Sequence, residues 1–114
     1  MTATEDLYRA REETLAQIGA LTREFDAVVA ASEAANADDE HDPEGATIAF
    51  ERQQLAALLD SARNRLADVD AALARAAAGL YGRCAECGRE IDPERLAARP
   101  QARTCIACAT AAGR

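Results

Sequence analysis

Four cysteines stand in two close pairs near the C-terminal end of the sequence. Cys84 and Cys87 form one C-x2-C pair, and Cys105 and Cys108 form a second pair after 17 intervening residues. Two such knuckles at this spacing are typical of a tetrahedral four-thiolate zinc site. Because the protein supplies all four ligands, no coordination position stays open for water or substrate. We therefore expect one structural Zn2+ and no enzymatic activity.

Paired cysteines have two other uses, which the rest of the sequence disfavours. A dithiol redox pair needs one C-x-x-C motif beside a βαβ pattern, and the sequence contains no such pattern. Disulfides would need an oxidising compartment. No apolar run follows Met1, and no stretch approaches the roughly 20 apolar residues that cross a membrane. We therefore expect a cytoplasmic protein without a membrane segment, in which the thiols stay reduced and bind metal.

The residues upstream of the cysteines have the periodicity of a coiled coil. In residues 2–35, a capping-box pattern of Thr2 and Glu5 precedes residues at sevenfold spacing, and residues 48–80 carry a nearly unbroken 4-3 alternation of apolar residues. Each segment thus predicts a long helix with one narrow apolar stripe. The first series is Leu7, Thr14, Leu21 and Val28, and the second is Ile48, Leu55, Leu59, Ala62, Leu66, Val69, Leu73, Ala76 and Leu80.

A polar segment, residues 36–45, interrupts both patterns. Its shortness requires the two helices to run antiparallel. Asp42 followed by Pro43 is a favourable pair for the start of the second helix, whose ~35 residues would extend roughly 50 Å. We predict a mainly α fold in which an antiparallel coiled-coil hairpin (residues 1–79, acidic tip at 36–45) precedes a small four-cysteine zinc finger (residues 80–114).

Composition and charge restrict the possible partners. The 114 residues include two Phe, two Tyr and no Trp, so the finger has few large side chains for a core and depends on its metal. The net charge is −7, with −9 in residues 1–79 and +2 in residues 80–114. Because DNA binding depends on Lys and Arg that neutralise phosphates, we expect no direct sequence-specific DNA binding. A protein with a basic surface is the expected partner.

The C-terminal segment resembles the DksA/TraR family of zinc-finger proteins. The resemblance rests on residues 80–88 (LYGRCAECG), Ile91, residues 95–100 (RLAARP) and residues 105–108 (CIAC), and the order of hairpin and finger agrees with it. It implies a transcription regulator that binds RNA polymerase and inserts its coiled coil into the secondary channel. The alternative is a zinc-ribbon adaptor whose acidic coiled coil binds another protein partner.

The resemblance also implies a role for the hairpin tip, which in the family carries the element Asp-Pro-x-Asp-x-Ala. Here residues 42–46 read Asp-Pro-Glu-Gly-Ala, one residue shorter and without the second Asp. Asp42 and Ala46 match the element, Glu44 is a substitute for the missing acid, and Asp39 adds charge. From the residues alone, these carboxylates could approach basic side chains or a bound Mg2+, or they could cap a helix and solvate a turn.

The positions of the basic residues bear on two contacts, one with a partner protein and one with an alarmone. Arg95 and Arg99 belong to a basic side of the finger that could contact a partner or solvate the surface. Relatives in the family bind the alarmone ppGpp through basic side chains near the base of the coil. Here residues 68–79 offer only Arg75, so alarmone binding is doubtful and alarmone dependence cannot be carried over from the family. Whether the protein activates or inhibits transcription is left open by the sequence.

Overall fold

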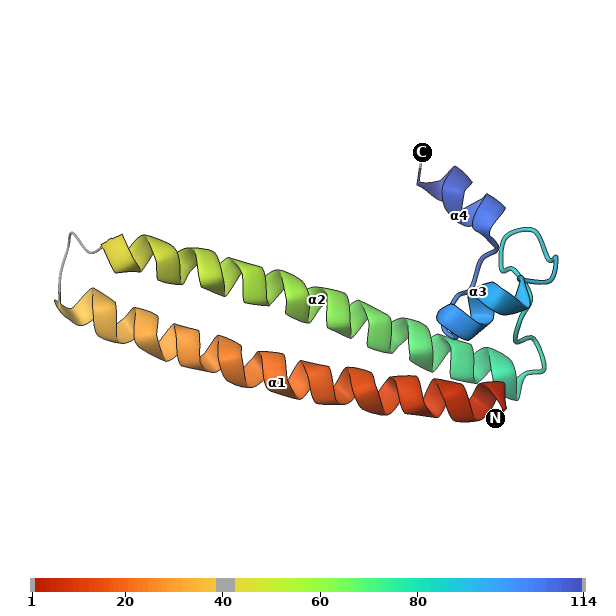
Figure 1. Cartoon of the computed structure of the whole chain (residues 1–114), viewed down its shortest axis with the longest axis horizontal. Coiled ribbons are helices and arrows are strands. Elements are labelled where there is room, and N and C mark those ends of the chain that lie inside the picture. The colour runs from red at the N-terminus through yellow and green to blue at the C-terminus, as the bar shows by residue number, and fades with distance from the viewer. Residues whose placement is uncertain (1, 39–42, 114) are drawn as a thin grey trace. The chain divides into compact units, whose positions relative to one another are not determined.

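The computed structural model describes residues 2–38 and 43–113, and their side chains except at positions 35–38, 43 and 44. In chain order the helices are α1 (Ala3–Asp38), α2 (Pro43–Ala77), α3 (Pro93–Ala98) and α4 (Ile106–Ala112) (Figure 1). The described residues form no strand beyond one isolated antiparallel bridge between Arg83 and Glu90. The mainly α fold is therefore confirmed. None of the described helices is long and apolar enough to cross a bilayer.

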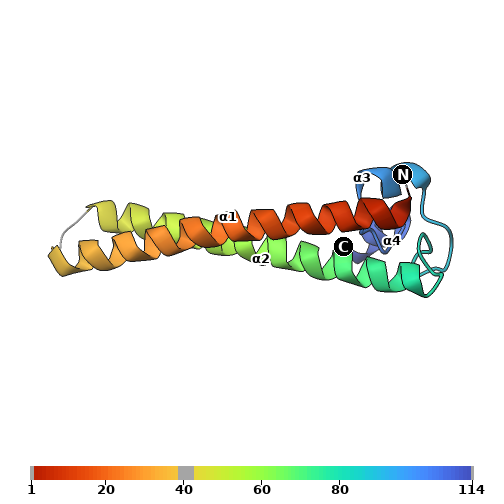
Figure 2. The ribbon, with the colours of Figure 1, turned by 90° about the horizontal axis from the view of Figure 1, so that it is seen from below.

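The two long helices form the predicted hairpin, and they lie side by side in the view of Figure 1 and in the rotated view of Figure 2. At the start of α1, the backbone N–H of Glu5 donates to Thr2 Oγ1 at 3.1 Å, as the capping pattern predicts. The second helix begins at Pro43, as predicted, whereas α1 continues to Asp38 and so reaches further into the polar segment than its composition indicates. Polar residues lower helix propensity only slightly, so they do not define where a long helix ends.

A glycine ends α2 in the expected place. Gly79 has a φ of +75°, which is in the left-handed region that residues with a Cβ rarely adopt. The backbone N–H of Leu80 donates to the carbonyl of Arg75 at 2.9 Å, and that of Gly79 donates to the carbonyl of Ala76 at 3.1 Å. This pair of bonds is a Schellman motif, which satisfies the last carbonyls of the helix and turns the chain toward the cysteines.

The chain divides into two compact units, and the division crosses both long helices. The first unit contains residues 1–13 and 65–114, and the second contains residues 14–64. The finger therefore shares a unit with the first residues of α1 and the last residues of α2. The sequence analysis places a domain boundary between residues 79 and 80. That boundary concerns which segments fold independently, and it stays a prediction.

The first unit has a small core between the helices. Leu7 and Val69 are completely buried there, with Ala10 and Ala72 filling the spaces between the helices. Tyr81, which follows the end of α2, packs against this cluster. An exposed salt bridge between Arg11 Nε and Asp70 Oδ1, 2.8 Å long, joins the same two helices. A residue at the start of the finger, Tyr81, thus packs against the core between the two long helices.

The second unit is packed more thinly. Its buried side chains among the described residues are Thr14, Leu59 and Ala62. Other seam positions that the heptads predict to be apolar, such as Val28 and Leu55, are only half-buried. Two helices alone cannot enclose a seam on all sides, so part of this apolar surface remains in contact with solvent.

Candidate metal centre

The first cysteine pair lies in a tight turn that follows α2. The backbone N–H of Cys84 donates to the carbonyl of Arg89 at 2.8 Å, and the N–H of Gly88 donates back to the carbonyl of Cys84 at 3.0 Å. Gly88 has a φ of +75°, so the turn requires the left-handed conformation directly after Cys87. These bonds hold the two thiols on the same side of the turn.

The second cysteine pair lies at the start of α4. Cys105 is the N-cap residue of this helix and Cys108 belongs to its first turn, which places their two side chains on one side of the helix end. The backbone N–H of Ala85 donates to the carbonyl of Arg103 at 2.8 Å. This bond ties the segment before the second pair to the first turn and brings the two knuckles together.

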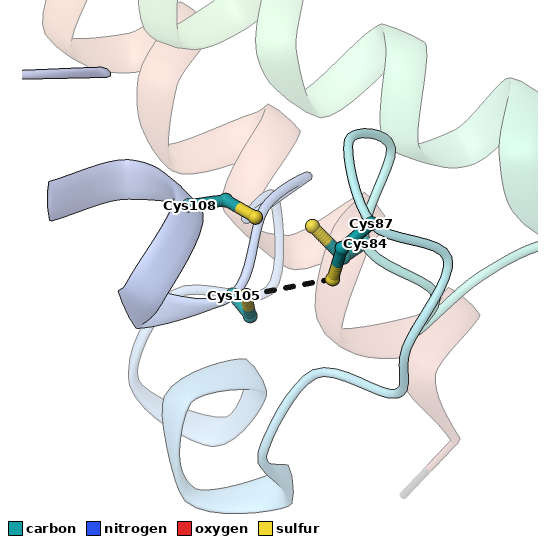
Figure 3. A group of neighbouring side chains, drawn as sticks. All are labelled: Cys84, Cys87, Cys105 and Cys108. Carbon is teal, nitrogen blue, oxygen red and sulfur yellow. Dashed lines mark hydrogen bonds between the residues drawn. The ribbon is translucent and has the colours of Figure 1, made fainter. Parts of the chain in front are cut away.

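The four thiols converge on one point, as Figure 3 shows. Their sulfur atoms all lie within 4.8 Å of one another, and Cys87 Sγ and Cys105 Sγ are 3.9 Å apart. Four sulfurs at ~2.3 Å from a tetrahedral Zn2+ would be separated by about 3.8 Å. All four cysteines are free, and Cys84 is buried. The cluster therefore fits one zinc ion, and these cysteines would supply its complete shell.

The local electrostatics favour a thiolate at Cys84. The backbone N–H groups of Cys87 and then of Cys105 lower the pKa of the Cys84 thiol to about 6. In contrast, hydrogen bonds with the sulfurs of Cys105 and then of Cys84 raise the pKa of Cys108 to about 12, because they favour the protonated thiol of Cys108. A divalent cation at the centre would displace the remaining protons, because cysteines bind zinc as thiolates.

The segment between the cysteine pairs is held by bonds within the first unit. Asp92 caps α3 by accepting from the N–H of Glu94 at 2.9 Å. Arg95 Nε donates to the carbonyl of Thr104, also at 2.9 Å, and thereby links α3 to the approach to the second knuckle. Tyr81 Oη donates to the carbonyl of Pro100 at 2.8 Å. This bond of Tyr81 was not anticipated from the sequence. A tyrosine two residues after Gly79, the glycine that ends α2, was the feature that could have indicated it.

Besides the four cysteines, six residues were predicted to contact a partner. Arg95 is half-buried with its Nε engaged inside the finger, whereas Arg99 is exposed. Ala46, in the first turn of α2, is also exposed. Asp39 and Asp42 lie outside the described residues, and so does the side chain of Glu44. A partner-binding role for these six positions stays a prediction.

Comparisons with known proteins agree with both parts of this structure. A family model described as the prokaryotic dksA/traR C4-type zinc finger matches residues 79–112, which include the four cysteines. The structure of transcription factor DksA2 from Pseudomonas aeruginosa is 29% identical, with a TM-score of 0.76 over 97% of this chain and 80% of that chain. An uncharacterized protein of Aquifex aeolicus (strain VF5) is 43% identical over 56 residues, which are 46% of this chain. The chain matches only 39% of the length of that relative.

Proposed function

The chain belongs to the DksA/TraR family of C4-type zinc-finger proteins, and from this premise we propose that it is a transcription regulator that binds RNA polymerase. The observation that carries the proposal is the likeness over both parts. The finger matches the family model, and the match to transcription factor DksA2, a protein of known fold, extends over 97% of the chain, including the hairpin. A zinc-ribbon adaptor would need only the finger to be shared.

We further propose that the hairpin enters the secondary channel of the polymerase. Its tip would bring Asp42, Glu44, Ala46 and Asp39 near the catalytic centre, where carboxylates can approach basic side chains or a bound Mg2+. The charge distribution supports this direction. The second unit contains ten acidic residues and three arginines, which is −7, whereas the first unit contains ten of each. Insertion of the second unit would therefore carry the whole net negative charge of the protein into the channel.

The finger has a supporting role in this proposal. A closed shell of four thiolates leaves no position for substrate, so the metal would stabilise the fold and the protein would have no catalytic activity of its own. Arg99, and Arg95 through its remaining donors, would be available to contact the polymerase. A location in the cytoplasm, with the polymerase, follows from the same proposal.

Transcription by purified RNA polymerase with and without the zinc-loaded protein tests the proposal. We expect a change in product yield at sensitive promoters, and we expect the β′ subunit to be recovered with the tagged protein from cell extract. Cys105→Ser, which removes one zinc ligand, is the control and should lose both effects. Recovery of a different protein with no polymerase would support the adaptor instead, and the proposal would be withdrawn.

A further inference from the structure

An open groove runs along one side of the hairpin within the second unit. It has a volume of about 410 Å³, and apolar atoms form most of its lining. Val28 of α1 and Leu55 and Leu58 of α2 are the large apolar residues of its lining. Leu58 is 50% exposed although it is a large apolar side chain, and the two seam residues beneath it are only half-buried. The groove is thus a place where the seam of the coiled coil remains partly uncovered.

Acidic residues border this apolar strip on both helices. Glu24 of α1 and Glu51 of α2 line the groove, and both are exposed. No arginine lines it, in contrast to the smaller cavity of the same unit that includes Arg63. The groove therefore combines a mainly apolar lining with carboxylates from each helix, inside a unit whose net charge is −7.

We propose that this groove binds an amphipathic helix whose apolar ridge is flanked by Lys or Arg. A helix presents apolar residues at i, i+4 and i+7 along one edge, which suits an open groove between two helices. Its basic side chains would pair with Glu24 and Glu51, and its apolar ridge would cover Leu58 and the half-buried seam. The third helix would thereby complete the packing that two helices leave unfinished.

The same charges exclude a second copy of this chain as the occupant. Two second units in contact would bring together a net charge of −7 from each copy, and the carboxylates bordering the two grooves would repel one another. The proposal does not rest on polymerase binding, because it concerns the chemistry of the groove and is tested without the polymerase.

The test uses the full zinc-loaded protein and a labelled synthetic peptide of 16 residues. The peptide carries Leu at i, i+4, i+7 and i+11 with Lys on both flanks, and its binding is followed by fluorescence anisotropy at low salt. Leu58→Ser should weaken binding by about tenfold, the loss expected for a central apolar anchor. Leu15→Ser is the matched control, because Leu15 is 41% exposed in the same unit and does not line the groove. It should bind as the parent protein does.

A second pair of variants separates a site from general attraction between opposite charges. Glu24→Gln and Glu33→Gln remove the same charge from the same unit, but only Glu24 lines the groove. Glu24→Gln should weaken binding by about threefold and Glu33→Gln by less, with the difference lost in 0.5 M salt. Equal effects of the two serine variants, or no peptide binding, would overturn the proposal. So would a dimer in sedimentation analysis that Leu58→Ser dissolves, since a second copy would then occupy the groove.

Discussion

The Tyr81→Phe substitution tests whether the finger is fastened to the hairpin core. The substitution keeps the ring that packs against the buried cluster of the first unit and removes the hydroxyl that donates to the carbonyl of Pro100 at 2.8 Å. A neutral hydrogen bond contributes about 1 kcal/mol to the free energy of unfolding. In a domain of ~60–100 residues, a loss of this size lowers the melting temperature by roughly 4–8 °C. Thermal unfolding of the zinc-loaded protein, followed by circular dichroism, measures it.

Tyr8→Phe is the matched control, because Tyr8 lies in the same unit but is 57% exposed. Loss of the Tyr8 hydroxyl should change the free energy of unfolding by less than about 0.5 kcal/mol.

The pH dependence of stability gives an independent check. Burial, and then the charge of Asp6, raises the pKa of Tyr81 above 10.0, while Arg75 partly opposes the rise. Equal melting temperatures for Tyr81→Phe and Tyr8→Phe would refute the idea that the hydroxyl of Tyr81 fastens the finger to the hairpin core.

The sign of that pH effect follows from proton binding. Above pH 10 the unfolded chain loses the proton of Tyr81 while the folded chain still holds it, so the unfolding free energy falls as the pH rises through the folded pKa. Below pH 10 both states are protonated, and this contribution to stability is fully present. Tyr81→Phe should show a smaller decline in stability above pH 10 than the parent protein.

Three further predictions concern the metal, the knuckle and the tip. Chelation should release one zinc ion per chain, measured by elemental analysis, and should unfold α3 and α4. These two helices contain six and seven residues, whereas α1 and α2 contain 36 and 35. Most of the helical circular dichroism should therefore persist. Its disappearance would mean that hairpin and finger unfold together. Gly88→Ala should weaken zinc retention in a chelator competition by about tenfold, because the left-handed φ of +75° costs ~1–2 kcal/mol with a Cβ; unchanged retention would show that the turn relaxes freely. Asp42→Asn keeps a good helix cap but loses the charge, so it should fail in the transcription assay as Asp42→Ala does while polymerase binding continues; wild-type activity would assign Asp42 to capping alone.

The cysteine spacing and the heptads predicted most of what the structure contains. Two C-x2-C pairs leave few geometries open, so a cluster at Cys84, Cys87, Cys105 and Cys108 follows from local spacing and one chain reversal. The apolar stripe from Ile48 onward predicted the second helix because its period is that of a coiled coil. Both inferences depend on residues close together in sequence, which is why they could be made without coordinates.

Burial along the seam could not be predicted in the same way. Thr14 and Leu59 are buried, whereas Val28 and Leu55, which belong to the same predicted series, are only half-buried. A heptad pattern states which residues face the partner helix but not how closely the helices approach at each level. The bonds of Tyr81 to Pro100 and of Arg95 to Thr104 were also unforeseen, because they depend on how the loops of the finger pack in three dimensions.

Site-specific crosslinking from Ala46 to purified RNA polymerase tests the central claim most directly. Ala46 is exposed near the start of α2, so a photoreactive residue can replace it without disturbing the described core. Leu15, which is 41% exposed in the same unit, provides a second attachment point for comparison. We expect adducts from position 46 with polymerase segments next to the catalytic centre, and loss of these adducts after zinc removal. A zinc-loaded protein that binds the polymerase but forms adducts from position 46 only on its outer surface would contradict the account.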